Sequence, residues 1–294
     1  MRIGFIGVGK MGKWMAEHLL NGGYEVTIFD KNPDEVPGLQ EKGARAASSV
    51  SELGRENNFV ITMLPNSTVV EEVVAGVDGL FSAMMPGGVI IDMSSSYVLS
   101  TRRLAEDAKL KRLAFLDAPV SGGVKGAREG TLTIMVGGNP DDFQTVLPIL
   151  QHIGKKITLV GQTGAGHALK ALNNYLSAAS LYATTEAMVL AKTLGLDLNV
   201  ALESINTSSG QSYSTHYKFP NFVLPRTFDS GFSLELLLKD VKMATSLARD
   251  NKVPVFLASA VEQIYEAALR SGDPNLDHTE VVKFLEGITH QVLS

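Results

Sequence analysis

The sequence has no cysteine, which excludes disulfide bonds, thiolate metal ligands and a cysteine nucleophile. Its six histidines show no HxxxH or similar close pairing, so we expect no zinc site and no other bound metal. No uninterrupted apolar run approaches the roughly eighteen residues that cross a bilayer. The formal net charge of −5 gives no general attraction to nucleic acid or anionic lipid, so neither a nucleic acid nor a membrane is an expected partner.

What is present suits a globular enzyme. The 294 residues, of which 45% are hydrophobic, have room for two domains and a well-buried core. The first strand pattern begins at Ile3, so close to the N-terminus that no signal or transit peptide fits before it. We therefore expect a cytoplasmic location.

The most informative segment is a glycine-rich turn that reads Gly-Val-Gly-Lys-Met-Gly and joins an apolar run to a helical pattern. In a dinucleotide site a strand turns tightly into a helix, whose free N–H groups and positive dipole end face a pyrophosphate. Gly7 suits the turn, Gly9 lets the diphosphate approach the backbone, and Gly12 lets the helix pack closely. The predicted cofactor contacts here are Gly7, Val8, Gly9, Lys10, Met11 and Gly12.

A second strand pattern ends at Asp30, where a carboxylate can accept hydrogen bonds from an adenosine ribose. A carboxylate also repels a 2′-phosphate, which favours NAD as the cofactor. The ammonium of Lys31 could instead meet such a phosphate, so NADP stays the alternative. Asp30 and Lys31 are both predicted cofactor contacts.

Short apolar strands then alternate with helical segments as far as Gly161, which predicts a parallel sheet with crossover helices. Ligands of such sheets lie at the carboxyl ends of the strands, so the loops there should border the cofactor. The sequence therefore predicts the α/β class, beginning with a Rossmann dinucleotide-binding domain over residues 1–161.

The remaining residues, 162–294, predict an all-helical C-terminal domain. It begins with one uninterrupted helical pattern over 166–194, about 40 Å long at 1.5 Å per residue. A helix of this length usually joins domains or forms a subunit interface. Further helical patterns follow, but residues 209–231 contain two prolines and read as an irregular, functional loop.

Two segments carry groups suited to substrate chemistry. Lys170 and Asn174 lie four residues apart, so on a helix they share one face and can present a proton donor and an amide to one small ligand. A snorkelling lysine beside an exposed asparagine is the simpler alternative. The second segment, residues 117–123, offers backbone N–H groups and a hydroxyl to an anion such as a carboxylate, unless it is merely a turn.

Together these motifs resemble the β-hydroxyacid dehydrogenase family, whose members include 3-hydroxyisobutyrate dehydrogenase and tartronate semialdehyde reductase. The resemblance covers essentially the whole chain. It rests on the glycine turn at 7–12, Met-Leu-Pro at 63–65, the segment 117–123, the GxGxxxKxxxN motif at 164–174, and Phe-Ser-Leu at 232–234 leading to Lys239 and Asp240.

The resemblance implies an NAD(P)-dependent oxidoreductase that transfers a hydride between nicotinamide and the primary alcohol or aldehyde of a small β-hydroxyacid. It implies a site in the cleft between the domains, where Lys170 is the general acid and base and has a pKa lowered from its free value of about 10.4. A small acidic substrate is the expected partner, and the long helix predicts a homodimer or homotetramer. The residues assigned by resemblance are Ser121, Gly122, Gly123 and Asn174 for the substrate, and Leu64, Pro65, Ser95 and Lys239 for the cofactor.

Three alternatives stay open. An imine reductase-like enzyme would share both domains but typically has another residue at the position of Lys170. A non-catalytic dinucleotide-binding module would lack the lysine and gain basic segments. In a hydroxysulfonate or phosphonate dehydrogenase, residues 208–211 and Arg226 would be the place to look for contacts to the acid group.

Overall fold

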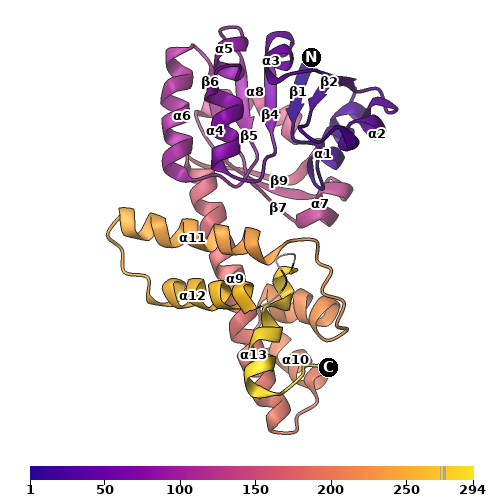
Figure 1. Cartoon of the computed structure of the whole chain (residues 1–294), viewed down its shortest axis with the longest axis vertical. Coiled ribbons are helices and arrows are strands. Elements are labelled where there is room, and N and C mark those ends of the chain that lie inside the picture. Colours follow the sequence, from indigo (N-terminus) through magenta and orange to yellow (C-terminus); the bar gives the residue numbers. More distant parts are fainter. Residues whose placement is uncertain (272, 274–275) are drawn as a thin grey trace. The chain divides into compact units, whose positions relative to one another are not determined.

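The computed structural model describes residues 1–271, 273 and 276–294, which form two compact units, residues 1–170 and 171–294. Figure 1 labels the elements of both units. Of the helices in the described ranges, none combines the length and apolar composition that crossing a membrane requires.

The described residues of the first unit form one nine-stranded sheet with the order β3-β2-β1-β4-β5-β6-β8-β7, and β9 pairs with β8. The first six strands are parallel, as the sequence predicts. β8 instead runs antiparallel to β6 and β7. The strands are β1 (Arg2–Ile6), β2 (Glu25–Phe29), β3 (Arg45–Ala46), β4 (Phe59–Thr62), β5 (Val89–Asp92), β6 (Ala114–Asp117), β7 (Val120–Ser121), β8 (Leu132–Gly137) and β9 (Gly154–Gly161).

The reversal at β8 follows from the short connection before it. A parallel return needs a crossover of a dozen or more residues. Only the seven-residue helix α7 (Gly123–Glu129) and its flanking turns separate β7 from β8, so the chain returns antiparallel.

Neighbouring residues of the strands alternate between two separate cores, one on each face of the sheet. Phe5, Ile61 and Leu116 belong to one core, and Val60 and Phe115 to the other. The first core packs on α1, α7 and α8, and the second on α3, α4, α5 and α6 (Figure 1). The helical elements of this unit are α1 (Gly12–Asn21), η1 (Pro33–Glu35), α2 (Pro37–Gln40), α3 (Val50–Glu56), α4 (Ser67–Ala75), α5 (Leu80–Ala83), α6 (Val98–Leu110), α7 and α8 (Pro140–Leu150).

Helix α9 (Ala165–Thr193) begins in the first unit and continues into the second, and its bounds lie within one residue of the helical pattern in the sequence. In the second unit Tyr265 and Phe219 are fully buried in a helical core, and the Tyr265 hydroxyl donates to the Ala178 carbonyl at 3.1 Å. The other helical elements are α10 (Leu198–Asn206), η2 (Ser214–Val223), α11 (Leu234–Asp250), α12 (Phe256–Ser271), η3 (His278–Glu280) and α13 (Val281–Thr289).

The prediction of an irregular loop over 209–231 is wrong for η2, which is a ten-residue π-helix. Its Leu224 N–H donates to the Phe219 carbonyl at 3.0 Å, five residues earlier. Phe219 and Val223 are fully buried, so this segment is part of the helical core.

Pro220 is the reason that the sequence conceals this helix. Proline has no N–H, so it cannot donate to the carbonyl of Thr215 five residues earlier. The side-chain amide of Asn206 donates to that carbonyl instead, at 3.2 Å. A contact from another helix thus replaces the missing backbone bond.

Gly12 is the tightest glycine position of the first helix. A Cβ added there would lie 1.9 Å from the Gly7 carbonyl oxygen, so Gly12→Ala must push α1 away from the turn. We expect the free energy of unfolding to fall by about 1–3 kcal/mol, measured by urea denaturation. Gly38→Ala is the control, since an added Cβ meets no described atom within 4 Å. A Gly12→Ala protein as stable as the control would contradict this packing.

Candidate functional site

The glycine turn after β1 has the backbone conformation that the sequence predicts. Gly7 has a φ of +94°, and a Cβ there would lie 2.3 Å from the Met63 carbonyl oxygen. Its N–H donates to the Phe29 carbonyl at 2.9 Å, which ties the turn to the end of β2. Glycine is therefore required at position 7 by both conformation and space.

Gly9 differs from Gly7 and Gly12 because the space that a side chain would occupy is open. Among the described residues, no atom lies within 4 Å of a Cβ added at Gly9. Packing within the protein therefore gives no reason for a missing side chain here. A ligand that must approach the backbone closely does give one, and this fits the diphosphate of a dinucleotide.

Asp30 follows β2 beside this turn and fixes it. One carboxylate oxygen accepts the Val8 N–H at 2.7 Å, and the other accepts the Asn32 N–H at 2.8 Å. Each oxygen can accept a further hydrogen bond, which is what a ribose diol needs. Lys31, the other predicted contact, is exposed beside it.

The loops after β4 and β5 lie side by side, because Thr62 pairs with Asp92 at the ends of the two strands. The Ser94 hydroxyl accepts the Leu64 N–H at 2.9 Å, which joins one loop to the other. The predicted cofactor contacts Leu64, Pro65 and Ser95 thus lie at the same carboxyl edge of the sheet as the glycine turn.

At the end of β6, the buried carboxylate of Asp117 holds the beginning of α9. Its two oxygens accept the Gly164 N–H at 2.6 Å and the His167 N–H at 2.8 Å. Burial raises the pKa of Asp117 above its ordinary value, while nearby His167 and the two N–H groups act in the opposite direction. The first N–H groups of a helix have no partners within the helix, and here a side chain from the sheet supplies one.

The glycines around Asp117 are explained by this contact. Cβ atoms added at Gly137 and Gly166 would lie 2.5 and 2.8 Å from its carboxylate oxygens, and the one at Gly166 would also lie 2.3 Å from the Met135 carbonyl oxygen. Gly164 has a φ of +92°, which lets its N–H reach the carboxylate. The glycines of the GxGxxxKxxxN motif therefore attach the helix that carries Lys170.

The side chain of His167 also holds this first turn of α9 in place. The imidazole is fully buried, with Nδ1 2.8 Å from the Thr101 hydroxyl and Nε2 3.0 Å from the Ser94 carbonyl. Its Nε2 also lies 3.7 Å from the Asp92 carboxylate. Lys170, which is half-buried, follows His167 by three residues, less than one helical turn.

The segment 121–123 forms a turn at the end of β7. Ser121 pairs with Thr133 of β8, and Gly122 and Gly123 have φ values of +132° and +61°. Both glycines are exposed, so the turn lies at the surface of the first unit.

In the second unit, Asn174 is held by a residue that the sequence interpretation did not single out. Its side-chain N–H donates to the Asp240 carboxylate at 2.5 Å, and its carbonyl oxygen accepts from Asn173 at 3.1 Å. The Lys239 ammonium lies 3.3 Å from the other Asp240 oxygen. Asn174 and Lys239, predicted to contact substrate and cofactor, are thus linked through one buried carboxylate.

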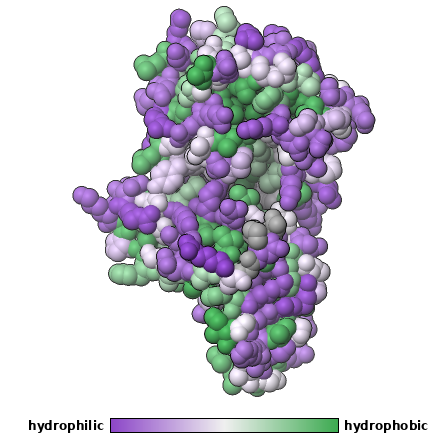
Figure 2. All heavy atoms as spheres, viewed as in Figure 1, coloured by the Kyte–Doolittle hydropathy of each residue, from purple (hydrophilic) through white to green (hydrophobic). Residues whose placement is uncertain are grey.

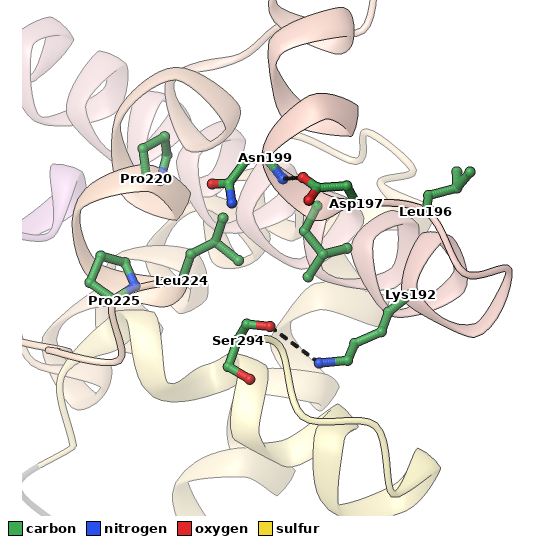
Figure 3. A pocket seen from close by; sticks show the side chains of 9 residues that line it. Lys192, Leu196, Asp197, Asn199, Pro220, Leu224, Pro225 and Ser294 are labelled. Carbon is green, nitrogen blue, oxygen red and sulfur yellow. Dashed lines mark hydrogen bonds between the residues drawn. The ribbon is translucent and has the colours of Figure 1, made fainter.

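A hollow of about 430 Å³ lies elsewhere in the second unit, at the C-terminal end of α9 (Figure 3). Lys192 and Ser294 line it, and the Lys192 ammonium donates to the Ser294 carbonyl at 3.3 Å. No predicted site residue lines this hollow.

Arg226 has a partner within the protein. Its guanidinium donates to the Glu286 carboxylate at 2.5 Å and to the Leu293 carbonyl at 3.3 Å. In the hydroxysulfonate alternative, Arg226 would contact the acid group of the substrate. Its charge is instead paired with a carboxylate of the protein.

Sequence reasoning gave no role to Asp92, Thr101, His167 or Asp240, although the last two lie in its motifs, and it assigned Asp117 only to an anion-binding turn. Some signal was present, since Asp92 and Asp117 both end apolar strands. Their partners lie tens of residues away in the chain, so spacing alone could not identify them.

Both halves of the chain match known protein families. Residues 2–161 match the NAD binding domain of 6-phosphogluconate dehydrogenase. Residues 164–285 match the family described as NAD-binding of NADP-dependent 3-hydroxyisobutyrate dehydrogenase.

Individual relatives match over nearly the full chain. The 2-(hydroxymethyl)glutarate dehydrogenase of Eubacterium barkeri is 39% identical over 289 residues, covering 98% of this chain and 96% of that protein. Human mitochondrial 3-hydroxyisobutyrate dehydrogenase is 36% identical, covering 96% of this chain and 86% of that protein. A structure of Mycobacterium tuberculosis 3-hydroxyisobutyrate dehydrogenase with L-serine has a TM-score of 0.90 and 33% identity, covering 97% and 98% of the two chains.

The sheet, the glycine turn and the matched domains define an NAD(P)-binding oxidoreductase. The chain belongs to the 3-hydroxyisobutyrate dehydrogenase family of β-hydroxyacid dehydrogenases. Its predicted fold class is confirmed: a Rossmann-type unit is followed by a helical one.

Gly9→Ala tests the cofactor position separately from stability. We expect the affinity for NADH to fall at least about tenfold, because the new methyl group occupies the approach of the diphosphate. The melting temperature should stay unchanged, since the space at Gly9 is open. Fluorescence titration with NADH measures the affinity, and an unchanged affinity would contradict the assignment.

Asp117→Asn tests the attachment of α9. An amide offers one acceptor oxygen where the carboxylate offers two, so one buried N–H loses its partner. We expect a loss of about 1–3 kcal/mol in the free energy of unfolding, measured by urea denaturation. Asp78→Asn, at an exposed position, is the matched control. Equal stability of the two variants would show that Asp117 does not hold the helix.

Proposed function

We propose that this protein transfers a hydride between nicotinamide and the alcohol carbon of a small β-hydroxyacid, with Lys170 as the general acid and base. The observation that carries the proposal is the attachment of α9. Asp117 and His167 hold the turn that precedes Lys170 at the sheet edge where the glycine turn and Asp30 lie. A proton-transfer group must be fixed in position to be effective, and this one is on a secured helix.

The bound dinucleotide would supply the hydride acceptor or donor at its nicotinamide ring. In the oxidation direction, Lys170 takes the proton from the substrate hydroxyl, and in reduction it returns that proton. Asn174 orients the hydroxyl with the amide hydrogen that Asp240 does not accept. The N–H groups and hydroxyl of residues 121–123 hold the acid group of the substrate.

We further propose NAD as the preferred cofactor. The support is Asp30, whose carboxylate is fixed at the ribose position by Val8 and Asn32 and would repel a 2′-phosphate. Leu64, Pro65, Ser95 and Lys239 complete the proposed cofactor contacts, together with the glycine turn and Lys31.

The alternatives have less support. The pairing of Arg226 with Glu286 weakens the sulfonate alternative. Lys170 argues against an imine reductase-like chemistry, and family membership argues against a non-catalytic module.

A homodimer or homotetramer stays part of the proposal. Hydrophilic residues cover much of the face shown in Figure 2, with apolar residues in small groups. Along α9, however, Leu176 and Leu190 are 62% and 59% exposed, which suits a helix that packs on another subunit. A cytoplasmic location also stays a prediction.

The test is the reduction of NAD and NADP by a panel of hydroxyacids. The panel includes 3-hydroxyisobutyrate, which has one acid group, and 2-(hydroxymethyl)glutarate, which has two. We expect Lys170→Ala to lower kcat by about 10²- to 10⁴-fold while NADH still binds. Lys109→Ala, on the exposed surface of α6, is the control. Turnover retained in Lys170→Ala would refute the proposed role of this lysine.

A further inference from the structure

A face of α9 carries one polar residue beyond those assigned so far. Lys170, Asn174 and Ser177 are spaced by four and three residues, so they lie on one side of the helix. Ser177 is half-buried and lies about 4.5 Å beyond Asn174 along the helix axis. A group bound between Lys170 and Asn174 could therefore extend to Ser177 through a short carbon chain.

The hydroxyl of Ser177 differs from the other serine and threonine hydroxyls of α9, all of whose residues the structure describes. Ser180, Thr184, Thr185 and Thr193 each donate to a backbone carbonyl three or four residues earlier. Ser177 makes no such bond in the described part of the chain. Its oxygen instead accepts from the Lys218 ammonium at 2.7 Å. The hydroxyl hydrogen is thus left to point away from Lys218.

Lys218 is an unusual partner, because its side chain is only 4% exposed and comes from η2. Within the described residues it forms no ion pair, and its other contact is the Ser177 carbonyl at 3.5 Å. Burying an ammonium without a carboxylate partner is costly. An anion bound near it would offset that cost.

The titratable groups near Lys218 do not already take the place of such an anion. Asp277 is the nearby carboxylate, and its charge acts to raise the pKa of Lys218, but it forms no ion pair with Lys218 and instead accepts from the Ser230 hydroxyl and the N–H groups of Gly231 and Thr279. Burial lowers the pKa of His278 to about 3, so His278 is neutral near pH 7. Asp277 therefore offsets the charge of Lys218 only without direct contact, and neutral His278 does not offset it.

We propose that Ser177, oriented and polarised by Lys218, donates a hydrogen bond to a second carboxylate of the substrate. The proposal rests on the proposed function, since it assumes that the reacting alcohol lies at Lys170. It narrows the substrate class to β-hydroxyacids with a second acid group. Lys218 acts through Ser177 and is therefore a positioning residue.

The test compares the one-acid and two-acid members of the panel. Ser177→Ala should lower kcat/KM for the diacid by about ten- to a hundredfold, mainly through KM, and leave the monoacid unchanged. Ser180→Ala is the matched control, because this serine lies one turn further on and its hydroxyl already has two partners, the Ser177 carbonyl and the Ser214 hydroxyl. Lys218→Met should lower the preference for the diacid over the monoacid without lowering the melting temperature, since it removes a buried charge that has no direct ion-pair partner among the described residues.

The pH dependence of KM for the diacid distinguishes a positioning role of Lys218 from a purely structural one. Burial lowers the pKa of Lys218 to about 7, so its charge is lost as the pH rises through that value. In the wild type, KM for the diacid should therefore rise above pH 7, and Lys218→Met should abolish this rise.

The outcomes distinguish the two proposals. Lys170-dependent turnover in which Ser177→Ala affects both acids equally, or neither, would overturn the second-carboxylate site alone. A wild type that prefers the monoacid would do the same. Turnover of neither acid would overturn the proposed function and this inference with it.

Discussion

The carboxylate of Asp117 is the contact on which the rest of the arrangement depends. It lies at the end of a sheet strand and accepts N–H groups from residues 47 and 50 positions later in the chain. Gly137 must lack a side chain because this carboxylate occupies its space, Gly166 because the Met135 carbonyl and this carboxylate occupy its space, and Gly164 must adopt a positive φ to reach the carboxylate. A buried carboxylate is costly unless its acceptors are used, so sheet and helix are mutually required.

Helix α9 then carries a row of polar side chains whose geometry is set by partners. His167 is held by Thr101 and the Ser94 carbonyl, Asn174 by Asp240, and Ser177 by Lys218. On Asn174 and Ser177 these partners leave a defined donor, the second amide hydrogen and the hydroxyl hydrogen, whereas both ring nitrogens of His167 are already used. The row is therefore organised before any ligand binds, which reduces the ordering cost of binding and reaction.

The sequence predicts the fold well where local pattern decides it. The glycine turn, five of the six parallel strands and the long helix follow from hydrophobic periodicity and glycine spacing, whereas the two-residue strand β3 has no such pattern. Periodicity does not predict the antiparallel return of β8, which depends on connection length, or η2, where Asn206 replaces a backbone donor missing at Pro220. Of the candidate site, the motifs place Lys170 and Asn174. Their supports, Asp117 and Asp240, become visible only when the chain has folded.

Amide hydrogen exchange at Gly164 and His167 tests the central claim most directly. If the Asp117 carboxylate holds these two N–H groups, both should exchange only through global unfolding, at the rate of the most protected strands of the sheet. Exchange of either amide by local opening, while the neighbouring strands stay protected, would contradict the claim that Asp117 secures the helix carrying Lys170.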